Sequence, residues 1–99
     1  MPRVGKSGTL PLMLFMVIEN FRDRERIRER FERQGRMLPE GVTYRASWVD
    51  LPGNRCFQVM EAIDQESLRR WLRRWDDLID FEVIEVLTSH DFWSKGKAD

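Results

Sequence analysis

The sequence has a single cysteine, Cys56, and a single histidine, His90. One cysteine cannot form a disulfide within the chain, and a structural zinc site needs a cluster of cysteine and histidine ligands. The sequence therefore predicts no metal and no cofactor. Lysine is also scarce, and the three lysines lie near the chain ends, at Lys6, Lys95 and Lys97.

Net charge of one sign and long hydrophobic runs are both lacking. The formal net charge is zero, so no overall field attracts nucleic acid or an anionic membrane. The longest apolar run, Leu10 to Ile18, is far too short to span a bilayer, and no small-residue cleavage site follows it. We therefore expect a soluble cytoplasmic protein with no nucleic-acid partner and no membrane association.

Charge is concentrated locally in residues 22–36, which hold seven arginines against four acidic residues. The acids are interleaved with the arginines, and Glu29 and Glu32 each have an arginine four residues later. This spacing supports a helix, so the segment is typical of a solvated helix face rather than a nucleic-acid surface.

The length of 99 residues suits one domain with one core. Residues 1–9 and 93–99 are rich in glycine and polar residues, which indicates tails. We expect a mobile N-terminal extension over 1–9, a single domain over 10–92 and a mobile C-terminal tail over 93–99.

Hydrophobic periodicity predicts six elements within this domain. The continuous apolar run 11–21 predicts a central strand buried on both faces, and the spacing over 23–38 predicts a helix. Alternation predicts strands on either side of the turn sequence LPGN, at 42–50 and 55–63. Residues 65–79 have the clearest helical stripe, with Asp64 as its cap, and 81–87 returns to strand periodicity.

The resulting order, β-α-β-β-α-β, predicts an α+β ferredoxin-like fold, in which a four-stranded antiparallel sheet carries two helices on one face. The other face is then uncovered. Apolar residues alternate on both sides of the first strand, with Phe15 on one side and Met16 and Ile18 on the other. We therefore expect a homodimer in which two sheets pack face to face.

The segments MLFMVIENF, GRMLPEGVTY, SWVD, RCFQVMEA and WDDLIDFEVIEVLTS lie within residues 13–89. Together they resemble an uncharacterised, mostly bacterial domain-of-unknown-function family of short proteins. The resemblance implies a fold of the dimeric α/β-barrel type but no particular activity. Such barrels include cofactor-independent monooxygenases, lactone isomerases, haem proteins and binders of small organic molecules. Members commonly begin near Met13, which implies that residues 1–12 are an extension or an upstream start.

Several conspicuous residues favour structural roles. Residues 5–7 read GKS but lack the strand, the earlier glycine and the helix of a phosphate-binding loop. Asp76 and Asp77 diverge on the expected helix, which favours a solvated ion-pair cluster with Arg73 over an ion site. Trp71 and Trp75 fall in the apolar stripe and are expected to pack on the sheet.

Cys56, His90 and the strand acids are also assigned structural roles. The Cys56 thiol is expected to be packed and unreactive, although the adjacent Arg55 raises the alternative of an activated thiolate. His90 follows the last strand and is expected at the surface rather than as a haem ligand or general base. Glu82 and Glu85 fall on opposite faces of one strand, so they make no acid–base pair.

Polar side chains on otherwise apolar strands are the strongest functional signal, because burying them without partners is costly. The candidate ligand-binding residues are Glu19, Asn20, Tyr44, Trp48, Cys56, Gln58, Met60 and Glu61. An alternative is that Gln58 and Glu61 bond to each other, to Arg45 or across a dimer. The sequence does not determine which strand face meets the helices, so which of these residues share a cavity stays open.

Three functions are compatible with these patterns. The leading hypothesis is a homodimer that binds a small organic ligand. The alternative is a cofactor-independent monooxygenase-like or isomerase-like enzyme, in which Asn20, Trp48 or Gln58 orients the substrate and Glu19 or Glu61 moves a proton. The third is a purely structural dimerisation module. No catalytic residue is assigned.

Overall fold

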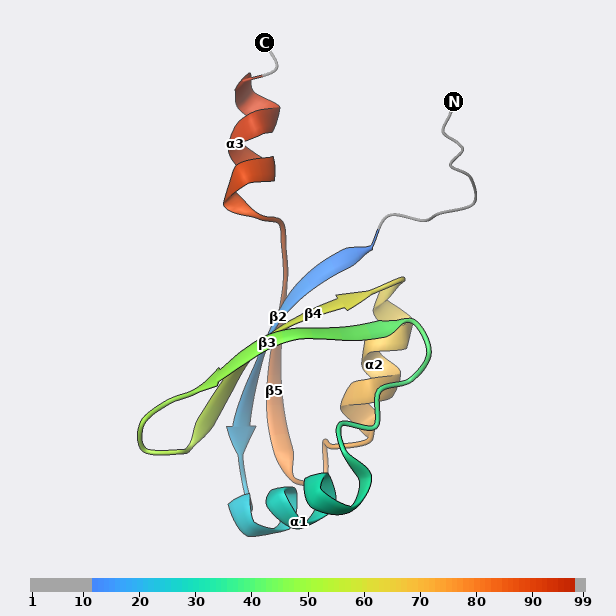
Figure 1. Ribbon diagram of the computed structural model, residues 1–99, viewed down its shortest axis with the longest axis vertical. Coiled ribbons are helices and arrows are strands. Elements are labelled where there is room, and N and C mark those ends of the chain that lie inside the picture. The colour runs from blue at the N-terminus through green and yellow to red at the C-terminus, as the bar shows by residue number, and fades with distance from the viewer. Residues whose placement is uncertain (1–11, 98–99) are drawn as a thin grey trace.

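The computed structural model describes residues 12–97 and contains one four-stranded sheet (Figure 1). In chain order, its elements are β2 (Met13–Phe21), α1 (Arg24–Gln34), β3 (Val42–Val49), β4 (Arg55–Ala62), α2 (Gln65–Arg73), β5 (Ile79–Val86) and α3 (Ser89–Lys97). The strand order is β3-β4-β2-β5, and every neighbouring pair is antiparallel. This confirms the ferredoxin-like topology. The expected extension 1–9, with its GKS stretch, lies outside the described residues.

The sheet has a face covered by α2 and a face that none of the described helices covers, which we call the open face. Along β2, Phe15, Val17 and Glu19 are buried toward α2, and the residues between them are only partly buried. The expected central position of this strand is confirmed, since β4 and β5 pair on its two sides. Its expected burial on both faces is not met within this chain as far as residues 12–97 show, because none of them forms a second layer on the open face.

The core lies between the sheet and α2. It consists of Phe15, Val17, Val42, Met60, Ala62, Leu68, Trp71, Trp75, Leu78 and Ile79. Trp71 and Trp75 are 2% and 4% exposed, which confirms that both indoles belong to the core. In contrast, α1 contributes no fully buried residue and lies at one end of the sheet (Figure 1).

Both main helices begin at an aspartate whose carboxylate accepts a backbone N–H bond. Asp23 accepts from Arg26 N at 3.2 Å, and Asp64 accepts from Ser67 N at 2.7 Å. The second contact confirms the predicted cap, and it lowers the pKa of the Asp64 carboxyl. Each cap satisfies a backbone donor that the helix itself leaves free.

The prediction placed the ends of both helices too late in the sequence. The first helix stops at Gln34, four residues before the expected end, because Gly35 takes a φ of 67° and its N–H bonds to the Phe31 carbonyl at 2.7 Å. The second helix stops at Arg73 and continues as tight turns, in which Trp75 N bonds to Leu72 O at 3.0 Å. These turns keep the apolar spacing, which is why periodicity could not reveal the true end.

The β3–β4 hairpin is confirmed, and Asp50 closes it. Its carboxylate accepts hydrogen bonds from Asn54 N at 2.8 Å and Arg55 N at 3.0 Å, which lowers its pKa. The prediction missed an irregularity between Tyr44 and Ala46, where the pairing register shifts. One extra residue there changes which side chains of the following stretch face the helices.

A third helix, α3, occupies Ser89–Lys97. We had expected the domain to end at residue 92 and a tail to follow over 93–99. Thr88 begins this helix: its hydroxyl accepts from Asp91 N at 3.0 Å and its carbonyl from Phe92 N at 3.0 Å. The helix extends away from the sheet (Figure 1). His90 lies on it and is exposed, as expected. No helix among residues 12–97 is long and apolar enough to cross a membrane.

Candidate functional site

The structure divides the candidate ligand-binding residues between the two faces of the sheet. On the face toward α2 lie Glu19, Tyr44, Cys56, Gln58 and Met60. On the open face lie Asn20, Trp48 and Glu61. The expected set therefore does not form one pocket, because neighbouring residues of a strand point to opposite sides.

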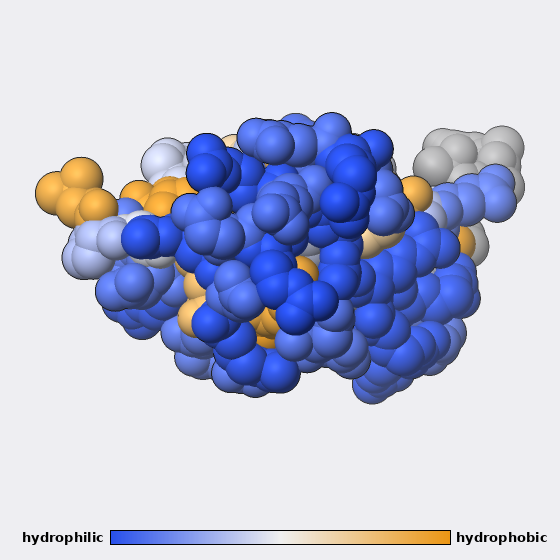
Figure 2. All heavy atoms as spheres, turned by 90° about the horizontal axis from the view of Figure 1, so that it is seen from below, coloured by the Kyte–Doolittle hydropathy of each residue, from blue (hydrophilic) through white to orange (hydrophobic). Residues whose placement is uncertain are grey.

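A cavity of about 200 Å³ lies on the face toward the helices, between the sheet and α1. We call it the helix-facing cavity. Its apolar walls are formed by Phe21, Ile27, Phe31, Val49, Trp75 and Ile79. Its polar lining consists of Glu19, Arg36, Ser47, Cys56 and Gln58. Seen from the α1 end, the molecular surface is mostly hydrophilic, with a small hydrophobic area between the hydrophilic side chains (Figure 2).

Glu19 and Gln58 form a buried polar pair in this cavity. Glu19 is 8% exposed and Gln58 is 4% exposed, and the Gln58 amide donates a hydrogen bond to the Glu19 carboxylate. Burial raises the pKa of Glu19 to about 7, and the bond from Gln58 and the charge of Arg36 only partly oppose this rise. Near neutral pH the neutral and the ionised form of Glu19 are therefore both populated.

Cys56 lies opposite Glu19 on the adjacent strand and lines the same cavity. Burial and the nearby Glu19 raise the pKa of the thiol to about 11, although a hydrogen bond with Ser47 opposes this. The thiol therefore stays protonated near neutral pH, and only a thiolate is a good nucleophile. The expected packing of Cys56 is confirmed, and its low reactivity stays a prediction.

Arg36 enters the site from the segment between α1 and β3. Its guanidinium lies 3.6 Å from the centre of the Tyr44 ring and 5.3 Å from that of Phe31. Its backbone carbonyl accepts hydrogen bonds from both core indoles, Trp71 at 2.9 Å and Trp75 at 3.0 Å. Arg36 is therefore fixed at its backbone by the core and at its side chain by stacking.

Ser47 is the remaining polar group of the cavity. Its hydroxyl lies 2.7 Å from the Tyr44 hydroxyl, so Tyr44 is tied to the polar lining although it does not line the cavity itself. Met60 is fully buried in the core and has no access to the cavity. Among the predicted residues, Glu19, Cys56 and Gln58 are thus the ones that the structure brings together here.

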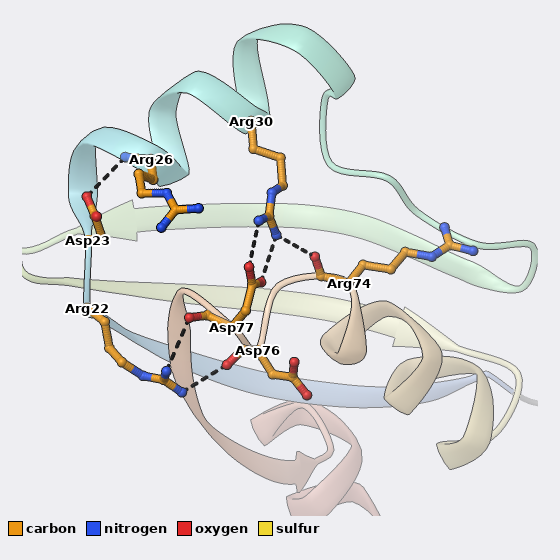
Figure 3. A network of polar contacts seen from close by, with 7 residues as sticks. All are labelled: Arg22, Asp23, Arg26, Arg30, Arg74, Asp76 and Asp77. Atoms are coloured by element: carbon orange, nitrogen blue, oxygen red, sulfur yellow. Dashed lines mark hydrogen bonds and ion pairs between the residues drawn. The ribbon is translucent and has the colours of Figure 1, made fainter.

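Asp77 forms an ion pair that holds α1 against the turn after α2, and Asp76 takes part in the same network through its backbone carbonyl (Figure 3). Arg30 donates to both carboxylate oxygens of Asp77, at 2.8 and 2.7 Å, and lowers the pKa of that carboxyl to about 2. Arg22 donates to the backbone carbonyls of both aspartates, at 2.9 and 3.2 Å. The ion-pair prediction was right in kind for Asp77 but wrong in partner, since Arg73 pairs with Glu66, and among residues 12–97 the Asp76 carboxylate forms no ion pair.

On the open face, the three remaining candidates have their own surroundings. Glu61 pairs with Arg45 at 3.2 Å, which is one of the alternatives that the sequence left open. The Asn20 amide lies 3.5 Å from the Glu82 carboxylate, at the edge of hydrogen-bond range. Trp48 is 60% exposed. Glu82 and Glu85 lie on opposite faces, as predicted from their strand spacing.

Sequence reasoning missed Arg36 and Ser47 as site residues. Arg36 looked like the last residue of a charged helix face, and the only contrary signal was Gly35, which ends that helix. Ser47 reaches the cavity because of the register shift after Tyr44, which no sequence pattern indicated. Among residues 12–97, no cluster of three or more histidine, cysteine or acidic side chains is placed to hold a metal ion.

Residues 13–98 match the family model described as a domain of unknown function, DUF3303. This match covers more than four-fifths of the chain, since 86 of the 99 residues lie within it. No curated protein and no solved structure matches the chain.

Proposed function

The chain belongs to the DUF3303 family, and we propose that it binds a small organic molecule in the helix-facing cavity. The observation that carries the proposal is the Glu19–Gln58 pair, a carboxyl and an amide held together at the wall of a largely apolar cavity. A core without a ligand gains nothing from such a pair, because apolar residues in its place would avoid the cost of burying polar groups.

The dimensions and lining of the cavity define what it can hold. A volume of about 200 Å³ is below the usual range of about 300–1,000 Å³ for drug-sized ligands, which favours a molecule with one ring. Three aromatic side chains, Phe21, Phe31 and Trp75, supply flat apolar surface for such a ring. Glu19 and Gln58 supply the hydrogen bonds that orient it.

A second candidate function uses the same site as a proton-transfer enzyme. A carboxyl with a pKa of about 7 is matched to general acid–base work at neutral pH. The proton-transfer role would belong to Glu19 with Gln58 orienting the substrate, since Glu61 lies on the open face and pairs with Arg45. A cofactor-independent isomerase would need no further group to move a proton between two carbons.

We also propose that the binding unit is a homodimer formed through the open face. The open-face apolar residues include Leu14, Met16, Ile18, Trp48, Phe57, Val59, Ile84 and Val86. Charged pairs and single charges lie around them, such as Arg45 with Glu61 at one end and Asp80 with Arg22 at the other. An apolar centre with a polar rim is the usual anatomy of an interface between subunits, and a stable one buries about 800 Å² per partner.

Ligand capture tests the proposed function. Purified protein is incubated with a metabolite mixture, and retained compounds are identified by mass spectrometry. We expect wild type and Glu85→Gln to retain the same compound and Glu19→Gln to lose it, because Glu85 lies on the same sheet face but outside this cavity. Chemical change of the retained compound would support the enzyme, and retention without change would support the binder.

No retention by wild type would contradict both functions and leave the dimerisation module. Equal loss in Glu19→Gln and Glu85→Gln would contradict the assignment to this cavity. Both variants are checked for a native circular dichroism spectrum, so that unfolding is not mistaken for lost binding.

A further inference from the structure

Seven of the thirteen arginines among residues 12–97 have an acidic partner within 4.0 Å, and Arg36 is not one of them. Among residues 12–97, arginines in ion pairs within 4.0 Å are Arg22, Arg28, Arg30, Arg45, Arg55, Arg69 and Arg73. Arg36 forms none, although it lines a cavity that contains a carboxyl. Its positive charge is therefore available to a ligand.

The guanidinium of Arg36 is also held in position before any ligand arrives. Stacking on Tyr44 restricts the plane of the group, and the two indole hydrogen bonds fix the backbone from which it extends. A preorganised guanidinium loses little conformational entropy on binding and offers two parallel N–H donors to a carboxylate. The arrangement suits a planar anionic group better than a neutral one.

From this geometry we propose that the ligand is a small aromatic or alicyclic carboxylate. Its carboxylate pairs with Arg36, and its ring lies against the apolar walls of the helix-facing cavity, with Gln58 and Glu19 as the other polar contacts. This inference rests on the proposed ligand site and adds the chemical class of the ligand.

The single carboxyl of the cavity does not prevent an anion from entering. Glu19 is the acidic group there, and the other titratable or charged groups that line it are Arg36 and Cys56. Because burial raises the pKa of Glu19 to about 7, much of this group is neutral at pH 6 and repels no anion. The protonated form also gives the ligand a hydrogen-bond donor.

The test compares charged and neutral ligands of the same shape. Benzoate and benzamide, and cyclohexanecarboxylate and its amide, are titrated at pH 6 into protein labelled with ¹⁵N, and side-chain signals of Arg36 and Gln58 report the place of binding. We expect each carboxylate to bind about tenfold more tightly than its amide, as an added charge-assisted pair implies.

Substitution of Arg36 assigns that preference to one side chain. In Arg36→Gln we expect carboxylate and amide to bind equally, whereas Arg33→Gln should keep the preference because Arg33 lies outside this cavity. Arg36→Gln keeps the backbone carbonyl that accepts the hydrogen bonds of the two indoles. Arg36→Lys provides a second variant, which retains the positive charge but not the planar guanidinium with its two parallel donors.

The outcomes separate the two proposals. Tight binding of the amides in wild type, or a preference that survives in Arg36→Gln, would overturn the carboxylate inference and leave the ligand site intact. Perturbation of signals far from Gln58 and Arg36 would overturn it as well. If neither the carboxylate nor the amide of either pair binds, the carboxylate inference fails. Capture of an unrelated neutral compound in the metabolite experiment would then still support the proposed ligand site.

Discussion

The Gln58 amide donates its hydrogen bond to a Glu19 carboxylate that is 8% exposed and faces a cavity instead of bulk water. This contact joins the two central strands, β2 and β4, at the only end of the sheet where α1 lies close. A single hydrogen bond from a neutral amide does not restore the solvation that the carboxylate loses on burial. The ionised form of Glu19 therefore weakens the fold.

The first prediction concerns the dependence of stability on pH. The folded-state pKa of Glu19, about 7, lies above the 4.5 of an exposed glutamate, so the folded state holds the proton more tightly and its stability falls as pH rises between these values. Glu19→Gln has no proton to lose. We expect the stability of the variant relative to wild type to rise by about 2 kcal/mol between pH 5 and pH 8.

Urea unfolding curves at several pH values measure this difference. Glu85→Gln, a substitution at an exposed strand position, serves as the control. Its free energy of unfolding should change with pH in the same way as that of wild type. A constant gap between Glu19→Gln and wild type over pH 5 to 8 would show that Glu19 titrates at an ordinary pKa.

The second prediction concerns the Arg30–Asp77 pair that ties α1 to the turn after α2. The Arg30 guanidinium lowers the pKa of Asp77 from 3.8 to about 2, so the pair stabilises the fold above pH 4 and loses this effect as pH falls toward 2. We expect Asp77→Asn to lower the melting temperature at pH 7 and to approach wild type near pH 2.

The adjacent aspartate provides a matched control. Arg22 contacts the Asp76 backbone carbonyl, which Asp76→Asn retains, so this variant should melt close to wild type. If Asp76→Asn and Asp77→Asn lowered the melting temperature equally, the net negative charge of this turn, and not the specific pair of Arg30 with Asp77, would hold α1 in place.

The third prediction concerns Cys56. Because burial and Glu19 raise the pKa of its thiol to about 11, we expect a disulfide reagent to label native protein at pH 8 far more slowly than protein in 6 M guanidinium, where the thiol has an ordinary pKa. Glu19→Gln removes one cause of the raised pKa and should accelerate native labelling modestly. Rapid labelling of wild type would identify an accessible thiolate.

The fourth prediction concerns association through the open face. Sedimentation equilibrium at micromolar protein should give a dimer for wild type and a monomer for Trp48→Glu, because a charge buried within an apolar interface stays unpaired. Leu51→Glu places the same charge on the fully exposed hairpin turn and should remain a dimer. A wild-type monomer that binds no hydrophobic dye would contradict the interface.

Periodicity predicted the elements that depend on burial, and these are the ones confirmed. The apolar stripe that contains Trp71 and the alternation around Phe57 each show which side of a helix or strand is apolar. The sheet topology was then predicted from the order of these helices and strands along the chain. Helix ends depend instead on single backbone torsions. The φ of 67° at Gly35 is one example, and a stripe of side chains carries no record of it.

The candidate site was predictable only in part, for a related reason. Glu19 and Gln58 were detectable because polar residues on apolar strands are costly and therefore informative. Ser47 depends on a shift of strand register, and Arg36 depends on a turn of the chain after α1. Both are consequences of three-dimensional pairing between segments far apart in the sequence, so local pattern cannot reveal them.

The position of β2 in the sheet has a consequence for how the chain acquires its structure during synthesis. Among the described strands this one leaves the ribosome first, yet its two partners, β4 and β5, begin at Arg55 and Ile79. Until then its apolar residues and both backbone edges lack their native partners, and an unpaired apolar strand is prone to aggregate. The β3–β4 hairpin, which needs only local contacts, is expected to form first and to serve as the template on which β2 docks. A nascent chain that stops before Ile79 would keep one edge of β2 open, so the last strand also completes the protection of the first.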